Sequence, residues 1–213
     1  QIRASHDTAQ AILETIKERH INLILMGWKA ELPTSPDRIF GNVVDTLIRQ
    51  APCDVVLVKL GHRDETHNGI TVASCPLPVA WNRWLVPVAG GPNSSYALQL
   101  IPALASHSSK RIIEVIQVFE PTTLSPDTGG LEKAAHALEQ QLSCEVLAIP
   151  VRSYSVSDAV IHLAHADRCD VVVLGASREG LLRQVMHGNI PEAIARGVNT
   201  TVILVRSAPD QSD

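Results

Sequence analysis

The sequence predicts an α/β protein with an open, doubly wound parallel sheet, joined to the carboxyl-terminal half of a second unit of the same kind. Two observations predict this class. Apolar runs rich in β-branched residues alternate with segments whose apolar residues recur at helical spacing, as in a parallel sheet covered on both faces. One stretch of the chain also repeats another at a nearly constant offset, which indicates homologous units.

Seven apolar runs are predicted to be strands, because each is short, β-branched and bounded by turn residues. They are residues 22–26, 54–60, 83–89, 111–118, 144–151, 170–174 and 200–206. Apolar residues that share one face predict helices between them. These helices are expected at residues 9–16, 43–48, 94–106, 131–142, 157–165 and 190–198.

The internal repeat predicts the domain organisation. The stretch from Gly41 to Lys59 aligns with the stretch from Gly188 to Arg206 at an offset of 147, and residues 25–27 align with residues 173–175 at an offset of 148. We therefore expect residues 1–61 to be the carboxyl-terminal half of a first unit, 62–82 a linker, 83–207 a complete second unit and 208–213 a tail. About three strands of the first unit are expected to precede Gln1.

The composition argues against several classes of function. A net charge of −4 and only 3% aromatic residues do not fit a nucleic-acid partner, which needs clustered cations and stacking rings. The four cysteines form no CxxC pair, so neither a zinc site nor a disulfide framework is expected. No Walker A or GxGxxG motif occurs, which argues against P-loop and nicotinamide enzymes.

The glycines mark a candidate binding site at the carboxyl ends of the strands, where ligands bind in open parallel sheets. Gly90 and Gly91 follow one strand and Gly175 follows another. Gly188 and Asn189 open the last helix, whose free N–H groups and dipole favour an anion or phosphate. The competing interpretation is structural, because Asn189 with Glu192, like Asn42 with Asp45, also has the spacing of a capping box.

Three motifs resemble the universal stress protein (UspA-like) family. They are Met26-Gly27-Trp28-Lys29, Arg38-Ile39-Phe40-Gly41-Asn42, and Leu85-Val86-Pro87-Val88 leading into Gly90-Gly91. The resemblance covers nearly the whole chain. It implies a five-stranded sheet with the strand order 3-2-1-4-5 in the complete unit. It also implies an adenine nucleotide, ATP or AMP, at the carboxyl edge.

The nucleotide-binding signature of the family is only partly kept. Gly175 and Gly188 have the family's spacing, but Arg178 and Asn189 stand where a glycine and a Ser or Thr are expected. Ala89 stands where the resemblance implies an Asp that contacts the nucleotide. A long side chain at position 178 fills space that a glycine leaves for phosphates; the alternative is that its guanidinium contacts a phosphate. Because of Arg178 and the missing carboxylate at Ala89, we expect ATP to bind poorly.

The resemblance assigns tentative nucleotide-binding residues and no catalytic or metal-binding ones. In the second unit they are Pro87, Val88, Ala89, Gly90, Gln117, Val118, Gly175, Ser177, Arg178, Gly188, Asn189 and Ile190. In the first unit they are Gly27, Lys29, Gly41 and Asn42.

Trp28 is expected to anchor an interface, because aromatic residues are so few.

The resemblance implies a regulatory or sensor domain without catalytic activity, on the cytoplasmic side of the cell membrane. The motifs are most similar to the paired units appended to amino-acid permeases, chloride channels and cation transporters, so the membrane-embedded part of the same polypeptide is an expected partner. A homodimer is also expected, because residues 200–205 form an apolar edge strand that needs a partner. The pairing is expected either between residues 54–60 and 200–206 within one chain or between two chains. The alternatives are a free-standing tandem stress protein that binds ATP or AMP, and a small hydrolase around Ser177.

Overall fold

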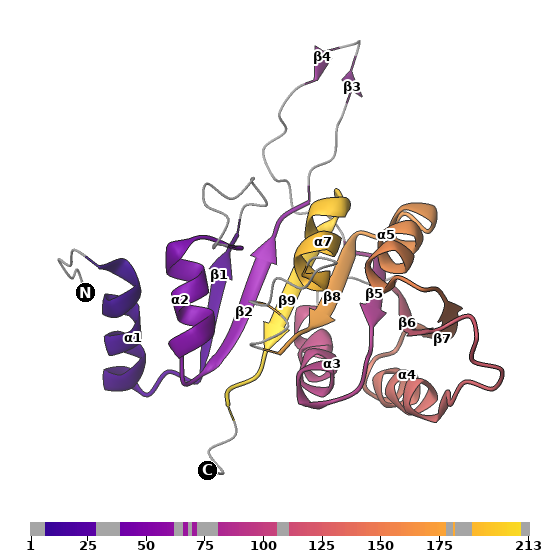
Figure 1. Cartoon of the computed structure of the whole chain (residues 1–213), viewed down its shortest axis with the longest axis horizontal. Coiled ribbons are helices and arrows are strands. Elements are labelled where there is room, and N and C mark those ends of the chain that lie inside the picture. The colour runs from indigo at the N-terminus through magenta and orange to yellow at the C-terminus, as the bar shows by residue number, and fades with distance from the viewer. Residues whose placement is uncertain are drawn as a thin grey trace.

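A computed structural model describes residues 7–28, 39–61, 66–67, 70–71, 81–105, 111–177, 181 and 189–209 (Figure 1). In chain order the elements are α1 (Thr8–Arg19), β1 (Leu23–Gly27), α2 (Asn42–Gln50), β2 (Asp54–Lys59), β3 (Thr66–His67), β4 (Ile70–Thr71), β5 (Arg83–Pro87), α3 (Pro92–Leu104), β6 (Ile112–Phe119), α4 (Gly129–Gln141), β7 (Glu145–Arg152), α5 (Val156–Ala166), β8 (Val171–Gly175), α7 (Ile190–Gly197) and β9 (Thr201–Arg206). The seven predicted strands are confirmed to within two residues at each end. The two-residue strands β3 and β4 lie in the segment predicted to be a linker.

The strands β1-β2-β9-β8-β5-β6-β7 form one seven-stranded sheet in this order. Residues 81–209 supply β5 to β9, which we call the five-stranded unit. Its strands are parallel and have the expected order 3-2-1-4-5. The α/β fold class and this strand order are therefore confirmed.

Residues 7–61, which we call the amino-terminal segment, continue the sheet at one end (Figure 1). Strand β2 pairs antiparallel with β9, from Val55 opposite Arg206 to Lys59 opposite Val202. The edge of β9 that was expected to need a partner is thus covered within the chain. The homodimer remains a prediction.

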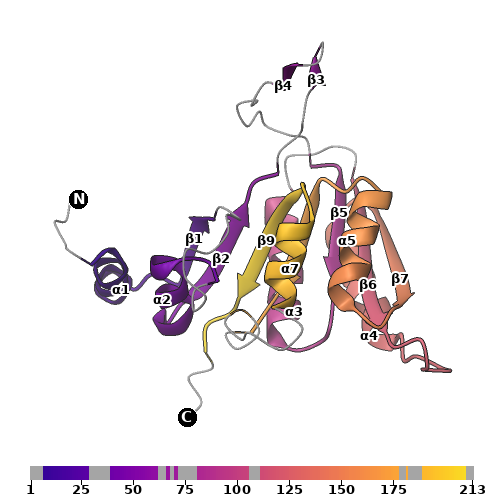
Figure 2. The same ribbon diagram turned by 45° about the horizontal axis from the view of Figure 1, so that its top comes forward.

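The helices cover the sheet unequally on its two faces (Figure 2). On one face, α1, α2, α5 and α7 enclose a core that includes Leu47, Val160 and Ile194. On the other face, α3 and α4 cover a second core around Ile101 and Leu138. None of the helices in the described part of the chain combines the length and hydropathy of a membrane-spanning segment.

Two buried cations join the amino-terminal segment to the five-stranded unit in a reciprocal way. Lys59, the last residue of β2, is 8% exposed, and its Nζ donates to the carbonyl oxygens of Ala195 (2.8 Å) and Val198 at the end of α7. Burial lowers the pKa of Lys59. Each carbonyl belongs to a helix C-terminus, where the dipole favours a positive charge.

Arg206 is the repeat equivalent of Lys59 and makes the matching contact in the opposite direction. It is 2% exposed, and its Nη2 donates to the carbonyl oxygens of Ala51 (3.0 Å) and Cys53 (2.8 Å), just after α2. Each half of the junction therefore supplies the cation that satisfies the end of a helix in the other half.

Candidate functional site

The carboxyl end of β5 presents an open glycine loop. Ala89, Gly90 and Gly91 are exposed, and Gly90 and Gly91 have φ values of +80° and +81°, which favour glycine. Gly91 is the N-cap of α3 and provides no side-chain hydrogen bond to the helix. The backbone N–H groups of the first turn of α3 lie at this edge, where an anion is favoured.

Strand β6 contributes the next two candidate residues. The Val88 N–H donates to the Ile116 carbonyl oxygen (2.8 Å), which places Gln117 and Val118 beside the end of β5. Gln117 and Val118 are both half-buried. The fold therefore brings the candidates of β5 and β6 to one edge of the sheet.

Gly175 has a packing role at this edge. A Cβ atom at Gly175 would lie 2.3 Å from the carbonyl oxygen of Asn93 and 2.5 Å from the amide nitrogen of Ser94. The first turn of α3 therefore packs directly against the end of β8. Asn93 is fixed in turn, because its Oδ1 accepts hydrogen bonds from the Ser207 N–H (2.8 Å) and hydroxyl (2.9 Å).

Helix α3 is also tied to the amino-terminal segment through Tyr96. The phenol hydroxyl bonds to the Asp54 carboxylate, and burial together with this bond raises the pKa of Tyr96 to about 12. Asp54 additionally accepts a hydrogen bond from the Ala208 N–H (2.6 Å). Helix α3, which borders the candidate site, is therefore held by hydrogen bonds to the end of β9 and to the start of β2.

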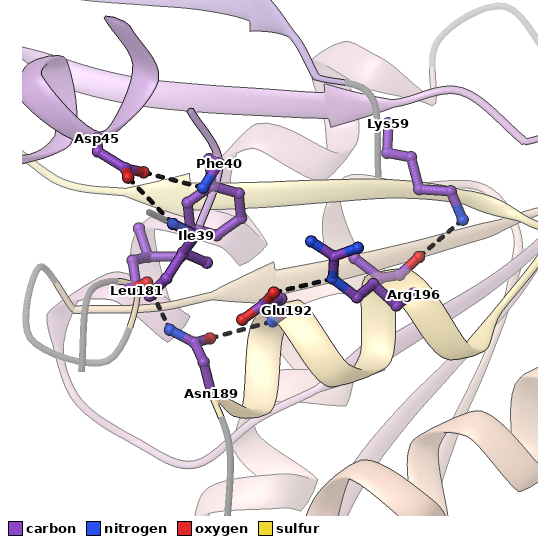
Figure 3. A network of polar contacts seen from close by, with 9 residues as sticks. Ile39, Phe40, Asp45, Lys59, Leu181, Asn189, Glu192 and Arg196 are labelled. Atoms are coloured by element: carbon purple, nitrogen blue, oxygen red, sulfur yellow. Dashed lines mark hydrogen bonds and ion pairs between the residues drawn. The ribbon is translucent and has the colours of Figure 1, made fainter. Parts of the chain in front are cut away.

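Asn189 uses its side chain to cap α7 (Figure 3). It is 3% exposed; its Oδ1 accepts from the Glu192 N–H (3.0 Å), and its Nδ2 donates to the Leu181 carbonyl oxygen. Glu192 pairs with Arg196 (2.8 Å). The capping interpretation is thus confirmed for Asn189, and its amide is occupied by protein partners on both sides.

For the remaining candidates of the five-stranded unit, the structure gives fewer contacts or none. Ser177 is exposed, and its carbonyl oxygen accepts from the Leu181 N–H (2.9 Å). Ile190 is 47% exposed on the first turn of α7. Arg178 and Gly188, like Lys29 of the first unit, lie outside the described residues.

The corresponding loop of the amino-terminal segment is built differently. Gly41, with φ +104°, is the N-cap of α2 and provides no side-chain hydrogen bond, while Asn42 is exposed. Asp45 is 5% exposed and accepts from the N–H groups of Ile39 (3.1 Å) and Phe40 (3.0 Å) (Figure 3). Asp45 therefore holds the chain that enters the helix, where a capping box with Asn42 was expected.

Trp28 belongs to the core. It is 7% exposed, and its ring meets the Phe40 ring edge to face with centroids 4.8 Å apart. The expectation that Trp28 anchors an interface is wrong. Its burial depends on contact with the next motif, a pairing that the composition does not reveal.

Comparisons with known proteins identify the family to which this sequence and fold are similar. The model of the universal stress protein family matches residues 1–59 and 81–206. The Na⁺/H⁺ antiporter NhaS5 of Synechocystis sp. is 24% identical over 206 residues, which are 95% of this chain and 27% of the antiporter. The chain thus spans about a quarter of the length of this relative.

Two solved structures share the fold. A universal stress protein from Archaeoglobus fulgidus has a TM-score of 0.65 and 14% identity; the match covers 96% of this chain and 67% of that one. A universal stress protein in complex with cAMP has a TM-score of 0.50 and 21% identity; the match covers 60% of this chain and 98% of that one. The chain belongs to the universal stress protein family.

Proposed function

We propose that this chain is a regulatory domain without catalytic activity, attached to a membrane transporter on the cytoplasmic side. The single observation that supports this best is the match of 95% of the chain to 27% of a Na⁺/H⁺ antiporter. A domain that forms part of a longer transporter can regulate it without chemistry, because a ligand that prefers one conformation shifts the balance between two states.

The proposed ligand is an adenine nucleotide, bound weakly at the carboxyl edge of β5 and β6. In favour of binding are the open Gly90–Gly91 loop, the start of α3, which has no side-chain cap, and the related structure solved with cAMP. Against tight binding are Ala89, which offers no carboxylate, and Asn189, whose amide is already bonded on both sides. Weak binding is the outcome that these features support together.

The junction provides a route by which such binding acts on the rest of the chain. The N-terminus of α7 lies at the site edge, and its C-terminal carbonyl oxygens hold Lys59 of β2. A ligand that shifts α7 therefore displaces Lys59 and the amino-terminal segment. Arg206 transmits in the opposite direction through α2.

Calorimetric titration of the purified chain with ATP, AMP and cAMP tests the ligand. We expect dissociation constants weaker than about 10 µM and no release of phosphate. Ala89→Asp with Arg178→Gly should tighten binding, whereas the matched Ala89→Asn with Arg178→Gly should tighten it less, because it restores no charge. Sub-micromolar ATP binding by the unchanged chain would contradict the weak site and favour a free-standing nucleotide-binding stress protein; turnover would favour a hydrolase.

The natural reading frame upstream of Gln1 tests the transporter. A series of hydrophobic spans of about 20 residues each supports it. A start codon only far enough upstream to complete one further unit would contradict it. With the spans present, ion flux measured with and without nucleotide, in the unchanged protein and in Lys59→Met, tests whether the junction transmits regulation.

A further inference from the structure

The amino ends of β5, β6 and β7 form the edge of the sheet opposite the candidate nucleotide site. These strands are parallel, so their first residues lie together at one edge and their last residues at the other. At about 3.3 Å per residue, β5 separates the two edges by roughly 15 Å. Residues at the amino edge therefore take no part in the nucleotide site.

A hollow of about 390 Å³ lies at this amino edge. It is lined by Asn82, Arg83, Arg111, Ile112, Ser143, Cys144 and Glu145. The backbone around it is held by hydrogen bonds. The Ile112 N–H donates to the Asn82 carbonyl oxygen (2.8 Å), and the Asn82 N–H donates to Oδ2 of Asp170 (2.9 Å). The fold thus forms the walls of the hollow, which we call the amino-edge hollow.

One of the two arginines in the lining, Arg83, already has a counter-charge. Its Nη2 donates to Oε1 of Glu114 (3.1 Å), a residue that is 5% exposed. Burial, reinforced by the nearby Asp167, raises the pKa of Glu114. Glu114 therefore has no surplus charge with which to compensate a second cation.

The other arginine, Arg111, has no counter-charge within the described ranges. Its Nε and Nη1 atoms are buried without a hydrogen-bond partner, and no ion pair to a described residue involves its guanidinium. Burial raises the pKa of Cys144 while Arg111 opposes this shift, which places the guanidinium charge near a residue of the lining. Arg111 has lost water without gaining an acceptor, and this costs free energy unless a bound group supplies one.

Glu145 and Ser143 determine which anion fits. Both are exposed at the amino-edge hollow. A carboxylate repels an anion that has only acceptor oxygens, such as sulfate, but it accepts a hydrogen bond from an anion that keeps a proton. Inorganic phosphate keeps one proton at neutral pH, whereas a phosphate monoester, with a second pKa of about 6, has mostly lost it. The lining therefore favours inorganic phosphate over sulfate and over phosphate esters.

We propose that the amino-edge hollow binds inorganic phosphate as its monohydrogen anion. Arg111 supplies the counter-charge, the Ser143 hydroxyl donates to a second oxygen, and Glu145 accepts the proton of the phosphate. The volume admits the ion together with water molecules that complete its hydrogen bonds. Bound phosphate ties the start of β6 to the start of β7. The proposal depends neither on nucleotide binding nor on a transporter.

Calorimetric titration of the 213-residue chain with sodium phosphate, sodium sulfate and glycerol phosphate, at neutral pH and constant ionic strength, tests the ligand. We expect a dissociation constant of about 1 mM for phosphate. Sulfate and glycerol phosphate should bind at least about tenfold more weakly. ATP should not displace phosphate, because the nucleotide site lies at the other edge of the sheet.

Three variants test the proposed contacts. Arg111→Met should weaken phosphate binding at least about tenfold. Glu145→Gln should abolish the preference for phosphate over sulfate, because the repelling charge is removed. The matched control is Arg152→Met, which removes an exposed positive charge at the far end of β7 and should leave phosphate binding unchanged. Circular dichroism verifies that each variant is folded.

The Cys144 thiol reports where the ion binds, because Cys144 lines the amino-edge hollow. Cys53 and Cys169 are buried, and Cys75→Ser removes the fourth thiol. In this chain, phosphate should slow the reaction of Cys144 with a maleimide. The same addition should have no effect once Arg111→Met is introduced.

Four results would overturn the proposal. A dissociation constant for phosphate above about 20 mM would show that the amino-edge hollow is no phosphate site. Equal affinities for phosphate and sulfate would show that Glu145 accepts no proton from the ion. Displacement by ATP would place the ion at the carboxyl edge, and unchanged binding in folded Arg111→Met would place it away from Arg111.

Discussion

The amino-terminal segment and the second half of the five-stranded unit repeat the same four elements in different surroundings. Their last strands, β2 and β9, are neighbours in the sheet, and there the two copies remain alike: Lys59 and Arg206 each cap a helix of the other copy. Away from this junction they differ. In one copy Asn189 caps the helix, and in the other Asp45 holds the loop. Equivalent residues thus keep equivalent roles only where their neighbours are also equivalent.

The largest effect should come from comparing the two strand-end glycines. Gly175→Ala should lower the free energy of unfolding by about 3 kcal/mol, because the new methyl group collides with helix backbone that cannot rotate away. Gly27→Ala should raise it by about 0.5 kcal/mol, since the site is open and alanine loses less entropy on folding. Urea unfolding followed by circular dichroism measures both, and equal effects would show that the two strand ends are packed alike.

Removing the reciprocal caps should be the next most costly change. Arg206→Met should destabilise the chain by about 2 kcal/mol, because two buried carbonyl oxygens lose their donor. Lys59→Met should cost about half as much, since the lowered pKa of Lys59 shows that burying its charge already offsets part of the gain. The two effects should add in the double variant, because the residues lie at opposite ends of the β2–β9 pair. If the loss of unfolding free energy in the double variant differed strongly from the sum of the two single losses, Lys59 and Arg206 would not be independent helix caps.

The two asparagines of the repeated motif should differ more modestly. Asn189→Ala should cost about 1 kcal/mol, the usual value of an N-cap, because both ends of its amide are bonded. Asn42→Ala should change stability by less than about 0.5 kcal/mol, since Asn42 is exposed and α2 has no side-chain cap. Thermal unfolding of both variants compares them, and a larger loss for Asn42 would reverse the assignment of the two roles.

The smallest expected effect is the pH dependence of stability that Lys59 causes. It should disappear when Lys59 is replaced by arginine, which stays charged. The folded pKa of Lys59 is lowered by burial, so its charged form is less favourable in the folded chain than in the unfolded one. Its contribution to stability should therefore rise as the pH increases from the lowered folded pKa toward the ordinary lysine pKa of 10.5. Unfolding curves for the wild type and Lys59→Arg across this range give the difference, in which the titration of Tyr96 cancels. A fall in wild-type stability relative to the variant would contradict the sign.

Local sequence was sufficient to predict where several of the candidate residues lie in the fold. Gly90 and Gly91 were expected in a loop directly after a strand, and each has a positive φ. The positions of Gln117 and Val118 beside β5 follow from the strand order. The role of Asn189 stayed open between capping and anion binding, because the decisive second bond goes to Leu181 across a loop. Asp45 was assigned to the wrong partner, since an acid in a first helical turn can reach several backbone N–H groups.

The sequence by itself determined the elements of the sheet and the internal repeat that relates the two segments, whereas the strand order of the five-stranded unit was implied by the resemblance to the universal stress protein family. Periodicity, turn residues and an internal repeat are local or self-referential signals, so one chain suffices to recognise them. Only the tertiary structure decided that β2 covers the edge of β9 and that Lys59 and Arg206 exchange helix caps over more than a hundred residues of chain. It also decided that Gly175 is a packing contact while Gly27 is not. Burial and hydrogen-bond partners depend on which distant segments come together, and that pairing is a property of the whole fold.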